Sequence, residues 1–167
     1  HCFPPAMITS LLHEYAAYDL WANERFIERL GREPDSVLDA HAQSSFPTLR
    51  RTLLHVRDAE CAWACRIAGE PVRWPAEPSL EVGTLLAHSK RLRDLVHGMD
   101  GAALLSDRVY RDLKGNEHGS TVWRMLMHCF NHSTQHRGQI ITQMRQLGLE
   151  GIPANDLIVH QRAQPRS

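Results

Sequence analysis

The sequence lacks several features, and each absence excludes a class of protein. Its 19 acidic residues balance its 19 basic residues, and no stretch gathers Lys and Arg among aromatic residues as a nucleic-acid-binding surface would. Hydrophobic runs stay well short of the roughly 20 residues that span a bilayer, and no signal peptide is recognisable near the start. We therefore expect a cytoplasmic protein that binds neither nucleic acid nor membranes.

Cysteine is scarce as well, with 4 among 167 residues, so a disulfide framework is not indicated. Cys61 and Cys65 lie one helical turn apart, which would suit a metal or a redox pair, but we favour two small buried residues. Cys2 belongs to the stretch HCFPPA before Met7. We interpret residues 1–6 as a tag or vector remnant and residues 7–167 as a single domain.

Hydrophobic residues recur every three or four positions in four long segments, which indicates helices. The predicted segments are 8–30, 45–69, 79–98 and 121–148. Ser45 and Ser79 are the candidate N-caps of the second and third helices. Gly69 and Gly148 are expected to end the second and fourth helices.

The stretch DRVYRDLKGNEHGS interrupts this helical pattern before the last helix. Val109 and Tyr110 precede the turn signal Lys114-Gly115-Asn116, which predicts a small hairpin. The chain after Gly151 reads as mostly irregular. The expected fold is therefore all-α: an antiparallel four-helix bundle with a short hairpin-like excursion before the last long helix. Such bundles build their sites in the core, from side chains on facing helices.

Histidine, in contrast, is abundant, with 11 residues. The stretch HCFNHSTQHRG spaces His128, His132 and His136 four residues apart on one helix, and residues four apart share a face. His128 and His136 would lie about 12 Å apart along the axis, whereas two nitrogens on one ion are separated by at most about 4 Å. Only one neighbouring pair can therefore share a metal ion.

A useful metal site needs a further ligand from another helix. His55 is the candidate, because its helical neighbours Thr52, Ala59 and Ala62 are small enough to let an ion or another helix approach. Three neutral imidazoles leave a position open for water or substrate, and they suit zinc or nickel better than calcium or magnesium. Such an ion would act as a Lewis acid or lower the pKa of a bound water or thiol.

Spacing alone leaves two interpretations of His132 and His136 equally open. They are either metal ligands or histidines whose hydrogen bonds are made by solvent or by groups of the core. Ser133 stands where the metalloprotease motif HExxH has its glutamate, which argues against a zinc protease.

Four strings together resemble the DinB-like family of small bacterial four-helix proteins. These strings are YDLWANERF, LLHVRDAECAWACRI, YRDLKGNEHGSTVW and NHSTQHRGQI, and the resemblance covers residues 7–156. It implies a divalent metal ion held by one histidine of the second helix and two of the last, which here are His55, His132 and His136. His128 resembles a family histidine that is not a ligand, and we expect it to support a ligand or to lie in the core.

The resemblance also marks Glu60, which falls on the hydrophobic stripe of the second helix, where an unpaired carboxylate is costly. Glu60 is expected either to partner a ligand histidine or to pair with an arginine such as Arg137, and we favour the second arrangement. Asn131, Arg137 and Gln139 either orient the site or have capping and surface roles.

Characterised relatives include metal-dependent thiol transferases that use bacillithiol and a mycothiol-dependent isomerase. The resemblance therefore implies a metal-dependent enzyme, a thiol S-transferase or a hydrolase that acts on a small electrophile, with a low-molecular-weight thiol as a candidate substrate. The alternative is a non-catalytic bundle that holds metal for stability or stress sensing. A homodimer could form through a face such as Trp21, Phe26 and Trp63, although we favour a core role for these aromatic residues.

Overall fold

The computed structural model describes residues 4–165. In chain order the elements are α1 (Pro5–Leu30), α2 (Asp35–Leu38), α3 (Leu49–Ala68), the 3₁₀ turn η1 (Val82–Thr84), α4 (Leu85–His97), α5 (Gly101–Leu105), β1 (Asp107–Arg111), β2 (Glu117–Thr121), α6 (Val122–Gln146) and α7 (Leu157–Ala163). The protein is mostly helical with one small antiparallel two-stranded sheet, as predicted.

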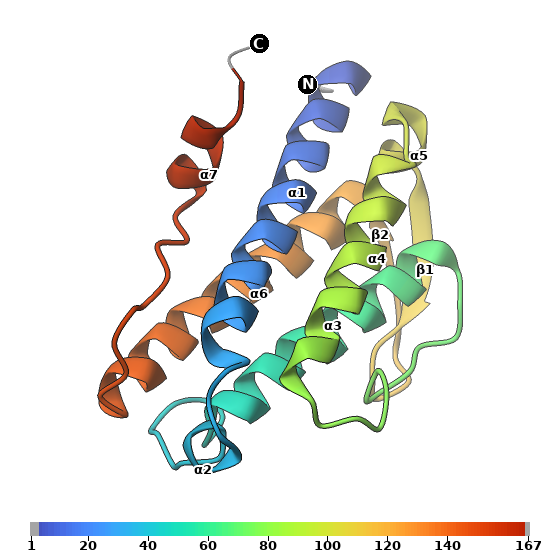
Figure 1. Ribbon diagram of the computed structural model, residues 1–167. Helices are drawn as coiled ribbons and strands as arrows, with labels where there is room; N and C mark the ends of the chain where they lie inside the picture. Colours follow the sequence, from blue (N-terminus) through green and yellow to red (C-terminus); the bar gives the residue numbers. More distant parts are fainter. Residues whose placement is uncertain (1–3, 166–167) are drawn as a thin grey trace.

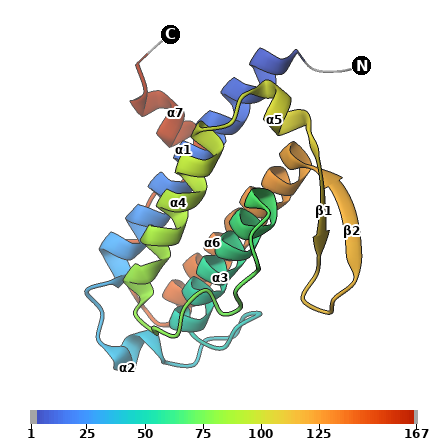
Figure 2. The ribbon, with the colours of Figure 1, turned by 90° about the vertical axis from the view of Figure 1, so that its right-hand side faces the viewer.

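The long helices form two layers, one of α1 and α4 and the other of α3 and α6 (Figure 1 and Figure 2). Helix α1 packs against α4 and α6, and helix α3 also packs against both. The helices within each layer run in opposite directions (Figure 1). The β1–β2 hairpin packs against one end of the layer formed by α3 and α6. The two helices that carry the predicted histidine ligands are therefore neighbours.

Two hydrophobic clusters hold the layers together. One cluster includes Leu12, Leu104 and Phe130, and the other includes Phe26 and Leu53; all of these residues are almost fully buried. Burying a large aliphatic or aromatic side chain stabilises a fold by about 1.5–3 kcal/mol. The buried polar residues of α1, α3, α4 and α6 are described with the candidate site.

The predicted start of the second helix is wrong by a few residues. Thr48, not Ser45, is the N-cap of α3, and its hydroxyl accepts a hydrogen bond from the backbone N–H of Arg51 at 3.1 Å. Pro47 keeps the residue before it out of the helical region, so the helix begins only after the proline. The predicted end at Gly69 is confirmed, because this glycine adopts the left-handed conformation with φ 73°.

The start of the third helix also differs from the prediction. The hydroxyl of Ser79 accepts from the backbone N–H of Glu81 and so closes a local turn, and the helical path begins with η1 at Val82. The short helix α7 was not predicted, because its seven residues are too few to show a periodic pattern. The predicted hairpin is confirmed, with Val109 opposite Gly119.

The predicted remnant at residues 1–6 is only partly within the described structure. Residues 1–3, which include Cys2, lie outside the described residues. Pro5 and Ala6 form the first turn of α1. Pro5 packs so closely on Gly101 that a Cβ atom there would lie 2.5 Å from the Cβ of Pro5. The N-terminal stretch excluded from the fold prediction thus contributes to the packing of α5.

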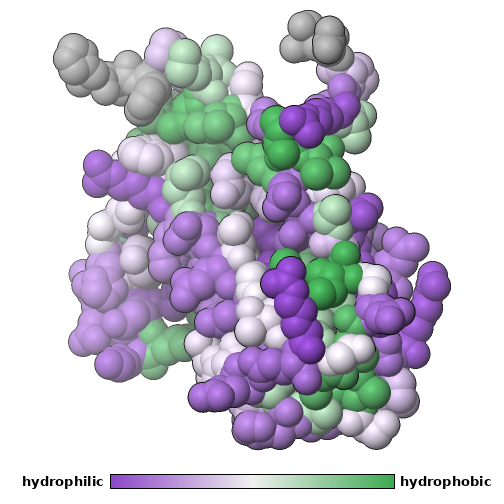
Figure 3. Space-filling view, turned by 90° about the vertical axis from the view of Figure 1, so that its left-hand side faces the viewer, coloured by the Kyte–Doolittle hydropathy of each residue, from purple (hydrophilic) through white to green (hydrophobic). Residues whose placement is uncertain are grey.

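The aromatic residues considered for a dimer interface have different environments. Phe26 belongs to the core, since only 1% of it is exposed. Trp21 is half-buried beside His160 of α7, and Trp63 is half-buried beside Tyr110 of β1. One face of the molecule mixes polar residues with several hydrophobic patches (Figure 3). The homodimer stays a prediction.

Among the described residues, no helix combines the length and the apolar character that a membrane span requires. The cytoplasmic location and the absence of nucleic-acid partners stay predictions from the sequence.

Candidate metal centre

Three histidines from the middle of α3 and α6 converge on one point. The Nε2 atom of His132 lies 3.0 Å from Nε2 of His55 and 3.1 Å from Nε2 of His136. One ligand atom from each of the three residues lies within 4.8 Å of the others. The structure thus brings together the three residues that the sequence analysis named as ligands.

The spacing of these nitrogens fits a bound transition-metal ion. At a metal–nitrogen distance of about 2.0–2.1 Å, ligands separated by octahedral or tetrahedral angles lie about 2.9–3.4 Å apart. The two separations from His132, 3.0 and 3.1 Å, fall within this range, and the three ligand atoms all lie within 4.8 Å of one another.

The environment of His55 and His132 keeps these two histidines neutral. Burial, reinforced by the neighbouring His136, lowers the pKa of His55 from 6.5 to about 4 and that of His132 to about 3. Both imidazoles therefore carry a free lone pair at neutral pH, which is the form that binds a metal ion.

Gln139 orients His136 from one turn further along α6. The Nδ1 atom of His136 lies 2.8 Å from Oε1 of Gln139, and the amide nitrogen of Gln139 donates to the hydroxyl of Ser45 at 2.8 Å. With Nδ1 as the donor, the lone pair of His136 is left on Nε2, the atom that faces the other two histidines. Of the two roles considered for Gln139, orienting the site is the one observed. His132 has no such support, because its Nδ1 is buried without a hydrogen-bond partner among the described residues.

Two aromatic residues that the sequence analysis did not name border the centre. The ring of Phe46 lies 4.4 Å from that of His55 and 5.7 Å from that of His136, measured between centroids. The edge of Trp74 faces His55 at 5.9 Å. Both aromatic residues directly precede a proline in a loop flanking α3, and this shared Phe-Pro and Trp-Pro pattern was the available signal.

The loop that carries Phe46 is held to α6 by glutamines. Gln143 donates to the backbone carbonyl of Phe46 at 2.8 Å. Gln146 exchanges two hydrogen bonds with the backbone of Gln43, at 2.7 and 3.0 Å. Together with Gln139 these residues lie on one face of α6, so a single helix positions two histidines and the aromatic residue beside them.

Glu60 forms neither of the two predicted pairings. It is fully buried, and its carboxylate accepts hydrogen bonds from Asn23 at 2.8 Å, Ser89 at 2.6 Å and Ser133 at 3.1 Å. Burial, with the nearby Asp19 carboxylate second, raises the pKa of Glu60 well above its usual value. The prediction failed because two of these three partners come from α1 and α4, whose register against α3 depends on the packed bundle.

Arg137 instead pairs with Asp19 of α1, at 2.7 Å. It also donates to Asn23 at 2.9 Å and to Thr134 at 3.1 Å. Asn23 therefore links the Arg137–Asp19 ion pair to Glu60. We call the buried residues of this cluster the polar network; they are Asp19, Asn23, Glu60, Ser89, Ser133 and Arg137.

The two remaining candidates from the motif lie outside the centre. His128 is exposed, so the predicted core position is wrong; its ring packs against the edge of Trp63 at 5.0 Å and lies 6.2 Å from that of His132. Asn131 is exposed too, and among the described residues no hydrogen bond joins its side chain to a histidine. The roles proposed for both residues rested on their place in the motif, which does not report the direction of a side chain.

Cys61, Cys65 and Cys129 are buried. Burial, with the neighbouring Cys65 second, raises the pKa of Cys61 to about 11, and burial also raises the pKa of Cys129. A raised pKa disfavours the thiolate that nucleophilic and metal-binding cysteines require. Cys61 and Cys65 thus match the predicted alternative of small buried residues.

Comparison with known proteins agrees with these observations. Residues 7–167 match the sequence model of the DinB family. Protein DinB of Bacillus subtilis (strain 168) is 26% identical over 153 residues, which cover 83% of this chain and 87% of that protein. The match to the family model spans nearly the whole sequence, so the chain belongs to the DinB family.

Proposed function

We propose that this DinB-family protein binds a divalent metal ion, zinc or nickel, through His55, His132 and His136, and that it is an enzyme acting on a small electrophile. The observation that carries the proposal is the convergence of three imidazole nitrogens, with Nε2 of His132 lying 3.0 Å from that of His55 and 3.1 Å from that of His136. A metal ion with three histidine ligands keeps a position open for substrate, and it would lower the pKa of a thiol or water bound there.

A thiol fits the surroundings of the histidines better than water does. Among the described residues, no carboxylate hydrogen-bonds to any of the three histidines, and Glu60 is occupied in the polar network. A free thiol has a pKa of about 8.5 and free water one of about 15.7, so a thiol needs less help from a general base than water does to become the nucleophile. We therefore favour a thiol S-transferase over a hydrolase.

The predicted antiparallel four-helix bundle is part of this proposal. The mutual packing of α1, α3, α4 and α6, with opposite directions within each layer, supports it. Bundles of this kind place metal ligands on facing helices, as α3 and α6 do here.

The proposal is tested by measuring metal content and thiol consumption together. The purified protein should contain close to one metal equivalent, and the His55→Ala variant close to none. With mercaptoethanol and chlorodinitrobenzene, the thiol sulfur forms a bond to the ring carbon as chloride leaves with its electron pair, and the thiol proton passes to solvent. The His41→Ala variant changes an exposed histidine and serves as the matched control. Unchanged thiol turnover in the His55→Ala variant would reject the metal-enzyme proposal.

The non-catalytic alternative makes a different prediction in the same experiment. Because the histidines join α3 to α6, a bound ion would stabilise the fold even without catalysis. If the ion raises the melting temperature while thiol consumption stays at background, a structural or sensory metal site is the better description.

A further inference from the structure

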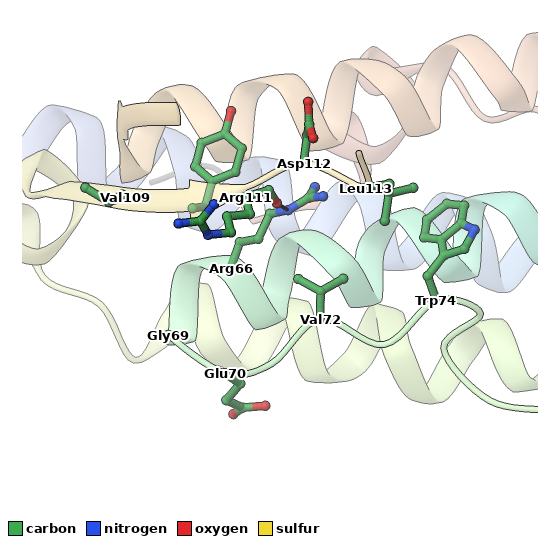
Figure 4. Close-up of a pocket in the computed structure, with 10 residues that line it drawn as sticks. Arg66, Gly69, Glu70, Val72, Trp74, Val109, Arg111, Asp112 and Leu113 are labelled. Carbon is green, nitrogen blue, oxygen red and sulfur yellow. Dashed lines mark hydrogen bonds between the residues drawn. The ribbon is translucent and has the colours of Figure 1, made fainter. Parts of the chain in front are cut away.

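A groove beside the β1–β2 hairpin has no role in the function proposed above. Its outer part is a cavity of about 490 Å³ between β1, the end of α3 and the loop that carries Trp74 (Figure 4). Its inner part, of about 300 Å³, lies between the hairpin, α3 and α6 and is bordered by His128. Both parts are lined by Arg66, Tyr110 and Asp112.

The three histidines do not line the groove, but two residues that do line it lie next to them. Trp74 lines the outer part, and its ring lies 5.9 Å from that of His55. His128 lines the inner part, and its ring lies 6.2 Å from that of His132. A molecule bound in the groove would therefore have one end directed toward the metal centre.

Arg66 places a positive charge in both parts of the groove. Its guanidinium lies over Trp63 at 4.6 Å and near Tyr110 at 5.5 Å, and its Nε donates to the carbonyl of Arg111 at 3.2 Å. Its two Nη atoms donate to no residue between positions 4 and 165, and burial lowers the pKa of Arg66. By contrast, the buried Arg57 donates to Asp58 and to three further oxygen atoms.

The other charges of the groove leave a positive excess. Glu70 is paired with Arg91 at 2.6 Å and points away from the groove (Figure 4), and Arg111 is paired with Glu117 at 3.0 Å. The carboxylate of Asp112 accepts hydrogen bonds from Asn116 and from backbone N–H groups of its own turn, and it pairs with His118 at 3.2 Å. Among the groove residues, Asp112 is thus the one carboxylate that is not paired with an arginine. Arg66 and the exposed Arg124 are the two arginines that are opposed by this single carboxylate.

We propose that this groove binds the carboxylate end of the small-molecule thiol whose sulfur is bound at the metal centre, with the Nη atoms of Arg66 donating to that carboxylate. The proposal rests on the proposed function. A guanidinium matches a carboxylate with two parallel hydrogen bonds, and the aromatic rings of Trp63 and Tyr110 fix its orientation.

The geometry also sets the length of the ligand. Arg66 follows His55 by 11 residues (66 − 55) on α3, which is about 16 Å along the helix axis. The arginine side chain leans back toward the start of the helix and spans roughly 6 Å, which leaves about 10 Å to the histidines. In a peptide thiol, the sulfur and the carboxylate of the residue after the cysteine are separated by about two residues, or roughly 7 Å at about 3.3 Å per residue. A metal–sulfur bond of about 2.3 Å and a hydrogen bond to Arg66 of about 2.8 Å would cover the remaining distance.

The test uses cobalt-loaded protein and two thiols of nearly equal size, glutathione and its glycine ethyl ester, which lacks one carboxylate. Binding of the thiolate to cobalt is followed by the charge-transfer absorption it produces, so no catalytic turnover is needed. We expect the wild-type protein to bind glutathione about tenfold or more tightly than the ester, as for a charge-assisted hydrogen-bonded pair.

The Arg66→Gln variant should lose this preference, and the Arg66→Lys variant should keep part of it. Arg32→Gln is the matched control, because Arg32 is 78% exposed at the far end of α1 and should leave the preference unchanged. Equal affinity of the wild-type protein for the two thiols, or a full preference in a folded, cobalt-loaded Arg66→Gln variant, would overturn the proposal. A cobalt spectrum that survives His55→Ala would instead reject the metal centre itself, so the two failures are distinguishable.

Discussion

Helices α3 and α6 contribute to two polar regions that differ in how their polar atoms are paired. In the polar network, Glu60 accepts three hydrogen bonds and Arg137 is paired with Asp19, so positive and negative groups neutralise each other inside the bundle. In the candidate metal centre, three imidazole nitrogens face one another, and Nδ1 of His132 is buried without a partner among the described residues. Complementary groups indicate a structural role, whereas converging groups of one kind indicate a place for a cation.

The largest effect is expected from breaking the polar network at its charge pair. The Arg137→Ala variant leaves the Asp19 carboxylate buried without its partner, which should lower the free energy of unfolding by about 3–5 kcal/mol. Urea denaturation measures this difference. The exposed Arg32→Ala variant should change it by less than about 0.5 kcal/mol. An Arg137→Ala variant as stable as the wild type would show that the network contributes little.

Removing a ligand of the candidate metal centre should instead change the metal content strongly and the stability only slightly. The His132→Ala variant removes the central nitrogen of the three, so metal content should fall close to zero. The metal-free protein should lose only about 1–2 kcal/mol of stability, because His132 makes no hydrogen bond to the polar network. Atomic emission gives the metal content and urea denaturation in the presence of a chelator gives the stability. Retention of a full metal equivalent would contradict the assignment of His132 as a ligand.

A smaller effect is expected at Gln139, which supports the centre without belonging to it. The Gln139→Ala variant frees Nδ1 of His136 and should weaken metal affinity by about 10–100-fold with little change in stability. Gln139→Glu keeps an acceptor oxygen and should restore most of the affinity. The exposed Gln135 of α6 provides the control variant Gln135→Ala. Equal affinities of the Gln139→Ala and Gln135→Ala variants in a competition titration with a chromophoric chelator would argue against a positioning role.

The pH dependence of the metal-free protein sharpens the comparison further. Folding lowers the pKa of His55 from 6.5 to about 4 and that of His132 to about 3, so the unfolded chain binds more protons in this interval. The stability that these histidines contribute is complete above pH 6.5 and is lost as the pH falls toward about 4. The His132→Ala variant should therefore show a weaker decline in stability on acidification, measured by urea denaturation at several pH values.

Glu60 should act in the opposite sense, because folding raises its pKa above the usual 4.5. The unfolded chain then releases a proton that the folded protein keeps, so this residue lowers stability as the pH rises above about 4.5. The Glu60→Gln variant removes that opposing contribution. Its stability should increase more steeply with pH than that of the wild-type protein, and an unchanged slope would argue against a raised pKa of Glu60 in the folded protein.

Much of the helical fold could be predicted because its signals are local. The hydrophobic period of α1 and α6, the glycine at position 69 and the turn at Gly115 each act over a few residues. The cap error at Ser45 arose because Ser44, Ser45 and Thr48 all precede α3 and only the packed chain decides which one caps it. Ser79 instead closes a local turn, and neither η1 nor α4 has a side-chain cap. The short helix α7 has too few residues for a periodic pattern to reveal it.

By itself the sequence determined the helical class, the family, and the three histidines that meet, because i and i+4 spacing and a family motif are properties of the chain alone. Only the tertiary structure decided which groups surround them. The partners of Glu60 come from other helices, Phe46 and Trp74 come from loops, and the groove at Arg66 exists because the hairpin folds back onto α3. These contacts depend on how separate elements pack, and packing distances are not encoded in the spacing of residues along one helix.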